Sequence, residues 1–299
     1  MPNYMQSPMR SQFDKALRGP MEYRRRSGGV FNPASMFTPT TPGWVYDLSD
    51  FSTLFQDSAG TIPVTAVEQP VGLVLDKSGN GNHASQPTTT KRPVLSSRVN
   101  LLTYSEDFSN AVWNAVSKKP AITPTTSPRG DLTAQKWTPA AVNDTYGCAH
   151  ASTHPNCKTG TYTIFAKNAG YNRIGLRSYD GTSYFIRGTV DLTTGAMVPD
   201  GSQAGVWNIV NAGNGWWRIE VTGTHAAAQF PTMAVEVLNT TLVQSAWTPN
   251  GVDGIYVWGV HLYYGPTALP FQWITTATNY DSDGFPLYLK GDGIDDFMS

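Results

Sequence analysis

The sequence has few charged residues and almost no net charge. Charged side chains make up 14% of the 299 residues, whereas about 25% is usual for soluble globular chains. The formal net charge is −1, so the chain lacks the broad positive field on which non-specific nucleic-acid binding depends. We therefore expect no nucleic acid among its partners.

Long apolar runs are missing as well. No stretch approaches the roughly 20 apolar residues of a transmembrane helix. The first residues, MPNYMQSPMR, lack the apolar segment of a secretory signal. These absences predict a protein that has no membrane among its partners and carries no obvious secretory signal.

Cysteine is scarce. Cys148 and Cys157 are too few for a disulfide framework and lack the CxxC spacing of metal sites. We expect plain thiols, with a local disulfide as the alternative. Because His150 and His154 are close in sequence, a Cys2His2 metal cluster is a further alternative, although such a stretch is more often a surface loop.

Turn-forming and aromatic residues are abundant, with 28 Gly, 21 Pro, 14 Tyr and 9 Trp. Between residues 98 and 278, short β-branched, aromatic or alternating segments such as GNGWWRIEVTGT end in turn residues. Roughly eight to ten such strands are typical of a sandwich. We therefore predict an all-β fold, an antiparallel β-sandwich (jelly roll) with an extended N-terminal arm.

Residues 1–40 form the predicted arm, which has six basic residues, two acidic residues and no helical or strand periodicity beyond a short helix-like piece. Its Met and Phe side chains cannot form a core alone, so we expect the arm to dock on a partner protein. A floppy tail is the alternative. The expected attachment residues are Arg10, Phe13, Arg18, Met21, Arg24, Arg25, Arg26 and Phe31.

Residues 41–97 carry a recognisable set of motifs: Trp44, Tyr46-Asp47, Ser49-Asp50, Leu54–Asp57 and Asp76–His83. This set resembles the opening of concanavalin-like (laminin-G-like) lectin domains in bacteriophage and prophage virion proteins. In such sequences an Arg-Pro and then a Phe-Asp-Gly-Val-Asp-Asp motif follow. Here Arg92-Pro93 is present, but the counterpart of the second motif is Lys290–Asp296 at the end of the chain.

About 180 residues therefore stand inserted in this module. We assign 41–97 to its first part, 98–278 to an inserted sandwich, and 279–299 to the return into the module, which is incomplete. The insertion has its own motifs: Asn100–Leu102, Ser105–Phe108, Trp113, Gly160–Thr163, Ala166-Lys167, Gly213–Arg218, Tyr256–Gly259 and Tyr280. It resembles jelly-roll domains of phage fibre, spike and tail proteins that are similar to carbohydrate-binding modules.

The resemblance implies a non-enzymatic virion structural protein, a fibre, spike, neck or decoration component assembled in the host cytoplasm. Its expected partners are other virion proteins, bound through the arm, and further copies of itself. The alternative is a carbohydrate-binding host-receptor adhesin or depolymerase-associated module that binds a host surface glycan. No enzyme motif appears, and Glu220 and Glu236 fall at strand positions that predict a solvent-facing side chain.

A sugar site needs flat aromatic faces with polar groups beside them. The candidates are Trp247, Trp216, Trp207, Tyr179 and Tyr184. Trp247 lies in the turn-like QSAWTPNG, which predicts an exposed ring, whereas Trp217 alternates with Ile219 and Val221, which predicts burial.

No cofactor is expected, with a structural calcium ion as the open alternative. Jelly rolls of the carbohydrate-binding type often hold one such ion, and its ligands would be Glu106, Asp107 and Asp253. These three acids are more often simply solvated.

Overall fold

The computed structural model describes residues 36–37, 41, 43–150, 154–155, 158–179, 183–199, 203–225, 229–230, 233–239 and 243–299. The arm predicted over residues 1–40, including all its attachment residues, lies outside this range apart from residues 36–37. The described chain forms two compact units. The sandwich unit is Asn100–Tyr280, and the split unit combines the described residues between 36 and 99 with Asp281–Ser299.

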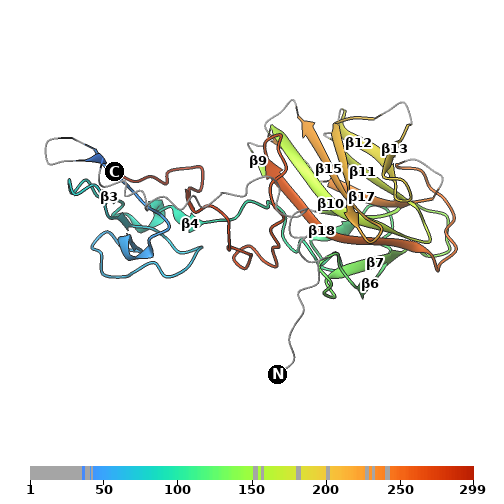
Figure 1. Cartoon of the computed structure of the whole chain (residues 1–299), viewed down its shortest axis with the longest axis horizontal. Helices are drawn as coiled ribbons and strands as arrows, with labels where there is room; N and C mark the ends of the chain where they lie inside the picture. The colour runs from blue at the N-terminus through green and yellow to red at the C-terminus, as the bar shows by residue number, and fades with distance from the viewer. Residues whose placement is uncertain are drawn as a thin grey trace, which may run out of the picture. The chain divides into compact units, whose positions relative to one another are not determined.

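Two six-stranded antiparallel sheets form the sandwich unit in the described residues (Figure 1). The first sheet has the order β14 (Val206–Gly213), β15 (Trp216–Thr224), β10 (Thr159–Ala169), β18 (Gly254–Tyr264), β7 (Ala134–Thr138) and β6 (Ala121–Thr125). The second has the order β13 (Ala196–Val198), β12 (Tyr184–Asp191), β11 (Arg173–Tyr179), β17 (Met233–Leu238), β8 (Tyr146–His150) and β5 (Trp113–Ala115). A further short pair joins β9 (His154–Pro155) to β16 (Gln229–Phe230). The predicted all-β sandwich is confirmed.

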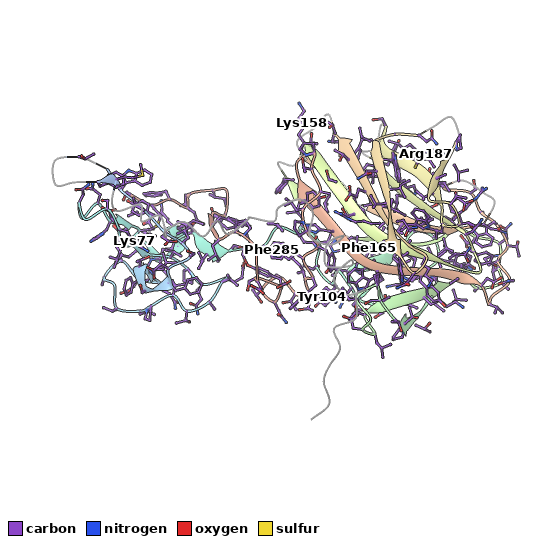
Figure 2. All side chains as sticks on the ribbon, in the orientation of Figure 1. Lys77, Tyr104, Lys158, Phe165, Arg187 and Phe285 are labelled. Atoms are coloured by element: carbon purple, nitrogen blue, oxygen red, sulfur yellow. The ribbon has the colours of Figure 1, made fainter. Side chains whose placement is uncertain are left out.

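Both faces of the first sheet are packed. On β10, Tyr162, Ile164 and Ala166 belong to the main core cluster between the sheets. Phe165, labelled in Figure 2, alternates with them and joins a second cluster with Trp216 and Trp258. Because side chains alternate along a strand, this second cluster lies on the outer face of the sheet. The sheet is therefore more apolar than a sheet with one solvated face.

The expectation that Glu220 and Glu236 face solvent is wrong. Glu220 is 8% exposed and Glu236 is fully buried, at 0%. Each carboxylate contacts an arginine. Glu220 contacts Arg218 on the same strand, β15, and Glu236 on β17 contacts Arg177 on the paired strand β11. Strand alternation gives the correct face for both residues, but other parts of the chain cover that face.

Residues 243–244 are one such cover, over the outer face of the second sheet. The Gln244 backbone N–H donates to Oε2 of Glu236 at 2.7 Å. Val243 is 2% exposed, and a Cβ built on Gly175 of β11 would lie 2.4 Å from its Cγ1. The bare Gly175 backbone therefore lets this segment lie directly on the sheet.

The split unit has its own core of Leu54, Val64, Val71, Val74 and Leu95. Its three-stranded sheet is β1 (Leu54–Phe55), β2 (Leu73–Val74) and β3 (Ala84–Ser85), with 3-10 helices η2 (Phe51–Thr53) and η3 (Thr89–Lys91) beside the strands in sequence. A second pair joins β4 (Val94–Ser96) to β19 (Tyr288–Lys290). The unit is thus built from both sides of the sandwich in the sequence.

The motif turn at residues 76–83 is held by one carboxylate. Asp76 accepts the backbone N–H of Val45 at 2.8 Å, of Ser78 at 2.8 Å and of Asn82 at 3.1 Å. Gly79, with a φ of 88°, adopts the left-handed conformation that glycine allows. Burial alone would raise the pKa of Asp76, but these donors and the Ser78 hydroxyl hold it well below the usual value.

In the part of the chain that the structure describes, no helix has the length and apolar character required to cross a membrane.

Candidate functional site

A pocket of about 340 Å³ opens beside β7 in the sandwich unit. Its lining residues are Tyr104, Glu106, Asp107, Pro124, Leu132, Thr133, Ala134, Gln135, Trp273, Ile274 and Thr275. The volume is within the range of small-molecule sites, and the lining combines aromatic side chains with carboxyl, amide and hydroxyl groups. We take this pocket as the candidate functional site.

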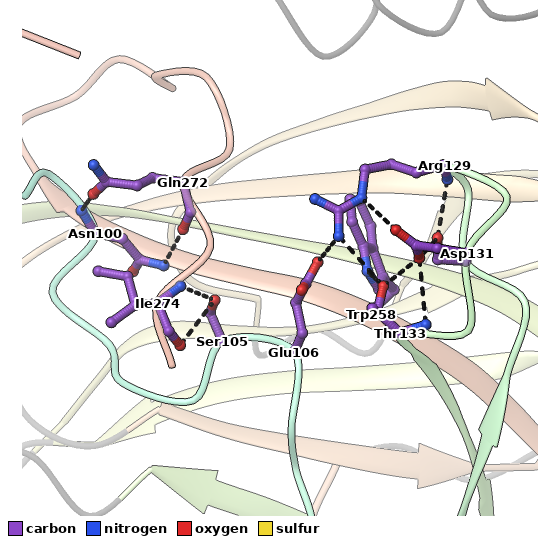
Figure 3. A network of polar contacts seen from close by, with 10 residues as sticks. Asn100, Ser105, Glu106, Arg129, Asp131, Thr133, Trp258, Gln272 and Ile274 are labelled. Atoms are coloured by element: carbon purple, nitrogen blue, oxygen red, sulfur yellow. Dashed lines mark hydrogen bonds and ion pairs between the residues drawn. The ribbon is translucent and has the colours of Figure 1, made fainter. Parts of the chain in front are cut away.

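Backbone pairing fixes the two loops that carry Tyr104 and Trp273. The Ser105 N–H donates to the carbonyl of Ile274 at 2.9 Å, and the Ile274 N–H donates to Oγ of Ser105 at 2.8 Å. Further along, the Asn100 side chain donates to the carbonyl of Gln272 at 3.0 Å (Figure 3). Side chains from distant parts of the sequence are therefore held at one wall.

Tyr104 has a backbone conformation that is rare for a bulky residue, with a φ of 51°. The indole N–H of Trp113 donates to its carbonyl at 3.1 Å, and the next residue, Ser105, is fully buried. The fold thus holds Tyr104 in a costly conformation at the pocket, which is common at functional sites.

Glu106, Arg129 and Asp131 form a charged network next to the pocket (Figure 3). Nη2 of Arg129 lies 2.6 Å from Glu106, and its Nε lies 3.1 Å from Asp131. The guanidinium also lies over the Trp258 ring, 4.9 Å from the centroid. Thr133 completes the network, because its hydroxyl donates to Asp131 at 2.5 Å and accepts the Trp258 indole N–H at 2.9 Å.

The two carboxyl groups of this network differ in pKa. Burial raises the pKa of Glu106 to about 7, with Arg129 acting in the opposite direction. Burial also acts on Asp131, but hydrogen bonds from Ser127 and Thr133 lower its pKa below the ordinary value. Glu106 therefore changes protonation near neutral pH, so that it can donate or accept a hydrogen bond at the pocket wall.

Two of the predicted sugar-binding aromatics are buried. Trp247 is 7% exposed, and its ring makes an edge contact with Tyr171 at 4.7 Å between centroids. The backbone of Trp247 pairs with Asp144 in both directions at 3.1 Å, which turns the ring into the main core. The exposed ring expected at Trp247 is therefore wrong. Trp216 is 4% exposed and packs in the outer-face cluster.

The other candidate aromatics lie elsewhere in the sandwich unit. Trp207 is half-buried against the main core, and its indole N–H donates to the carbonyl of Ala204 at 3.0 Å. Trp217, expected in the core, is half-buried at its edge. Tyr179 is 44% exposed and lies 4.8 Å from Tyr184 between ring centroids. These candidates do not line the pocket beside Glu106.

The three expected calcium ligands do not come together as a set, because Glu106 and Asp107 line the pocket and Asp253 does not. Glu106 pairs with Arg129, whereas Asp253 accepts the Asn250 side chain at 2.7 Å, and Asp107 accepts the Ser109 hydroxyl at 2.5 Å. Within the described ranges, the only group of three acids spaced for a metal is Asp292, Asp295 and Asp296. The Arg129 guanidinium supplies the positive charge at Glu106. The predicted calcium ion therefore has no assembled set of ligands in the described residues.

Cys148 is a free, buried thiol on β8, and burial raises its pKa to about 12. His150 packs edge-on against Trp113 at 4.8 Å between ring centroids. Because Cys148 is free, the alternative of a local disulfide between the two cysteines is not supported. Cys157 and the side chain of His154 lie outside the described residues, so that the metal cluster stays a sequence prediction.

The sequence interpretation missed Tyr104, Arg129, Asp131 and Trp273. A signal for two of them exists in the segment SPRGD, which places two opposite charges in one turn of a chain with few charges. For Tyr104 and Trp273 no local signal exists, because only the loop pairing brings them to one pocket.

The chain matches no family model, and no curated protein matches it. Among solved structures, one described as "CBM4 structure and function" is similar at 13% identity and a TM-score of 0.29. The match covers 58% of this chain and 88% of that chain. This likeness is too weak to bear on function.

Proposed function

We propose that the protein is a non-enzymatic structural component of a bacteriophage particle, a fibre, spike, neck or decoration protein. In this role its N-terminal arm binds other virion proteins and the sandwich unit is displayed. The motifs of residues 44–83 and the basic, Met-containing arm support the proposal.

The chain connections of the split unit carry this proposal. β4, just before the sandwich unit, pairs with β19, just after it, with Leu95 opposite Leu289. The Tyr288 hydroxyl also donates to the carbonyl of Arg98 at 2.7 Å. The sandwich unit is thus held by two covalent connections that leave from one pair of strands, which suits a domain that must stay attached under load.

The charged network next to the pocket is our reason for proposing binding and not catalysis. A glycosidase places two carboxyl groups on opposite sides of the scissile bond. Here Glu106 and Asp131 both contact the guanidinium of Arg129, so that the same cation lies between them. The network therefore resembles a structural ion cluster more than an acid and base pair.

Mass spectrometry of gradient-purified particles tests the virion role. We expect the intact chain in the particles at a fixed ratio to the capsid protein. A chain that remains in the soluble fraction of the producing cells, absent from washed particles, would contradict this role.

A second function, glycan binding, is favoured by the pocket itself. Tyr104 and Trp273 offer aromatic surface for the apolar side of a sugar ring, and Glu106, Asp107 and Gln135 offer groups that bind hydroxyls. This combination is what recognition of a host surface glycan requires.

A glycan array tests this second function. Binding by the wild type should be lost in Trp273→Ala and kept in Trp44→Ala, because Trp44 is 62% exposed in the split unit. Equal loss in both variants, or no binding by the wild type, would contradict a sugar site at this pocket.

A further inference from the structure

In the described residues, the two six-stranded sheets have four edge strands, which are not protected equally. Sheet edges present unpaired N–H and C=O groups, which proteins usually guard with short strands, proline or charge. β13 and β5 have three residues each, and β6 contains Pro124. β14 has eight residues, VWNIVNAG, with no proline and no charged residue. Of the four edge strands, β14 therefore lacks the protection by short length, proline or charge.

The free edge of β14 is open. In the described residues, the ladder with β15 is the strand pairing of β14, and no other backbone–backbone hydrogen bond involves residues 206–213. On the outer face, Val206 is 76% exposed and Val210 is 42% exposed. Trp207 and Ile209 point the other way, against the main core. The edge therefore offers backbone groups and an apolar outer surface.

We propose that β14 pairs antiparallel with β14 of a second copy of this chain, around a two-fold axis. Such pairing would join the first sheets of the two copies into one continuous sheet. The contact is isologous, because each copy contributes the same strand.

The register of the proposed β14–β14 pairing follows from the sheet face of each residue and from the length of the regular strand. Antiparallel partners must lie on the same face of the sheet, and the ladder with β15 shifts between Asn211 and Gly213. An axis at Ile209 uses the whole regular stretch. It places Val206 opposite Ala212 and Asn208 opposite Val210 on the outer face.

A second copy fits this edge better than a charged partner. The strand carries no charge, and the net charge of the chain is only −1, so that two copies repel each other weakly. Trp207 and Ile209 already pack on their own core, so the contact adds mainly backbone hydrogen bonds and outer-face side chains. A contact confined to one strand is small, below the roughly 1,200 Å² of stable interfaces, so the dimer should be weak and concentration-dependent.

Sedimentation velocity of the full chain tests the proposal over about 1 to 200 µM, the range in which small interfaces associate. The wild type should shift from monomer to dimer. Val210→Lys and Val210→Glu should each weaken association at least tenfold. An equal mixture of the two variants should restore it, because the two copies of residue 210 are diagonal neighbours, about 7–8 Å apart.

Val252→Lys is the matched control. Val252 is 69% exposed in the loop before β18, so that this variant should dimerise like the wild type. Circular dichroism checks that each variant is folded, and Val206→Lys replaces Val210→Lys if the latter does not fold.

Three results would overturn the proposal. A wild type that stays monomeric at all concentrations excludes the dimer. A dimer that survives Val210→Lys uses another surface. Folded Lys and Glu variants that fail to associate when mixed exclude the two-fold register, and leave the edge for a strand of another protein.

Discussion

Replacing Glu236 by Gln should destabilise the sandwich unit by about 3 kcal/mol. Glu236 is 0% exposed and accepts both Nε of Arg177 and the Gln244 backbone N–H. Removing one partner of a buried ion pair costs about 3–5 kcal/mol, because the other charge stays buried without compensation. The lower end applies here, since the Arg177 side chain is 18% exposed and Gln can still accept from Gln244.

A double variant that removes both charges distinguishes the effect of the ion pair from the cost of one unpaired buried charge. Arg177→Met should also be destabilising, because it leaves the Glu236 carboxylate buried without its cation. Arg177→Met combined with Glu236→Leu should cost clearly less than the sum of Arg177→Met and Glu236→Leu alone, by about 2 kcal/mol, since it removes both charges together. Lys118→Ala is the exposed control. Lys118 lies 3.7 Å from Asp144 with 47% of its side chain exposed, so its loss should cost below about 1 kcal/mol.

Urea unfolding, followed by tryptophan fluorescence, measures these changes in the free energy of unfolding. Every tryptophan except Trp44 lies in residues 100–280, so that the signal reports on the sandwich unit. Two results would refute a stabilising buried ion pair between Glu236 and Arg177. One is a loss of stability below about 1 kcal/mol for Glu236→Gln, and the other is a double variant whose loss equals the sum of the two single losses.

Trp247→Ala should cost about 3–5 kcal/mol in the same assay, through the cavity it leaves in the core, and a cost below about 1 kcal/mol would mean an exposed ring. Because the pKa of Glu106 is raised to about 7 in the folded chain, the folded state holds more protons between the ordinary pKa of a Glu and that value. Stability should therefore fall as pH rises across this window, and Glu106→Gln should flatten that part of the profile; an unchanged slope would contradict the raised pKa. The Cys148 thiol, with a pKa of about 12, should resist alkylation at pH 8 until the chain is unfolded, and rapid labelling would contradict its burial. Residues 98–278, expressed alone, should give a β-type circular dichroism spectrum and resist protease, since the sandwich unit has its own core; rapid digestion would show dependence on the split unit.

The sandwich could be predicted from the sequence because its strands alternate. Ile219 and Val221 share one face and both lie in the core. The same rule gave the wrong exposure for Glu220 and Glu236, since alternation assigns a face but does not say what covers it. The cover at Glu236 is a segment of the chain after β17, which no local pattern connects to that strand.

The pocket could not be predicted for a similar reason. Glu106 was singled out as an oxygen ligand, but its partner Arg129 comes from the turn between β6 and β7. Trp273 reaches the pocket only through the pairing of Ser105 with Ile274. The predicted exposure of Trp247 was wrong because its turn-like neighbours in sequence give no sign of the backbone pairing with Asp144. Each contact joins residues far apart in sequence, and sequence spacing carries no information about such contacts.

The proposed attachment of the chain to particles through its arm is tested most directly by a competition measurement. Particles are assembled with equal amounts of the full chain and a chain that lacks residues 1–40, and the two forms are counted in purified particles. We expect the full chain to be incorporated at least tenfold in excess, because in our proposal the basic arm supplies the contacts with other virion proteins. Equal incorporation would contradict attachment through the arm and would place the attachment surface on the rest of the chain.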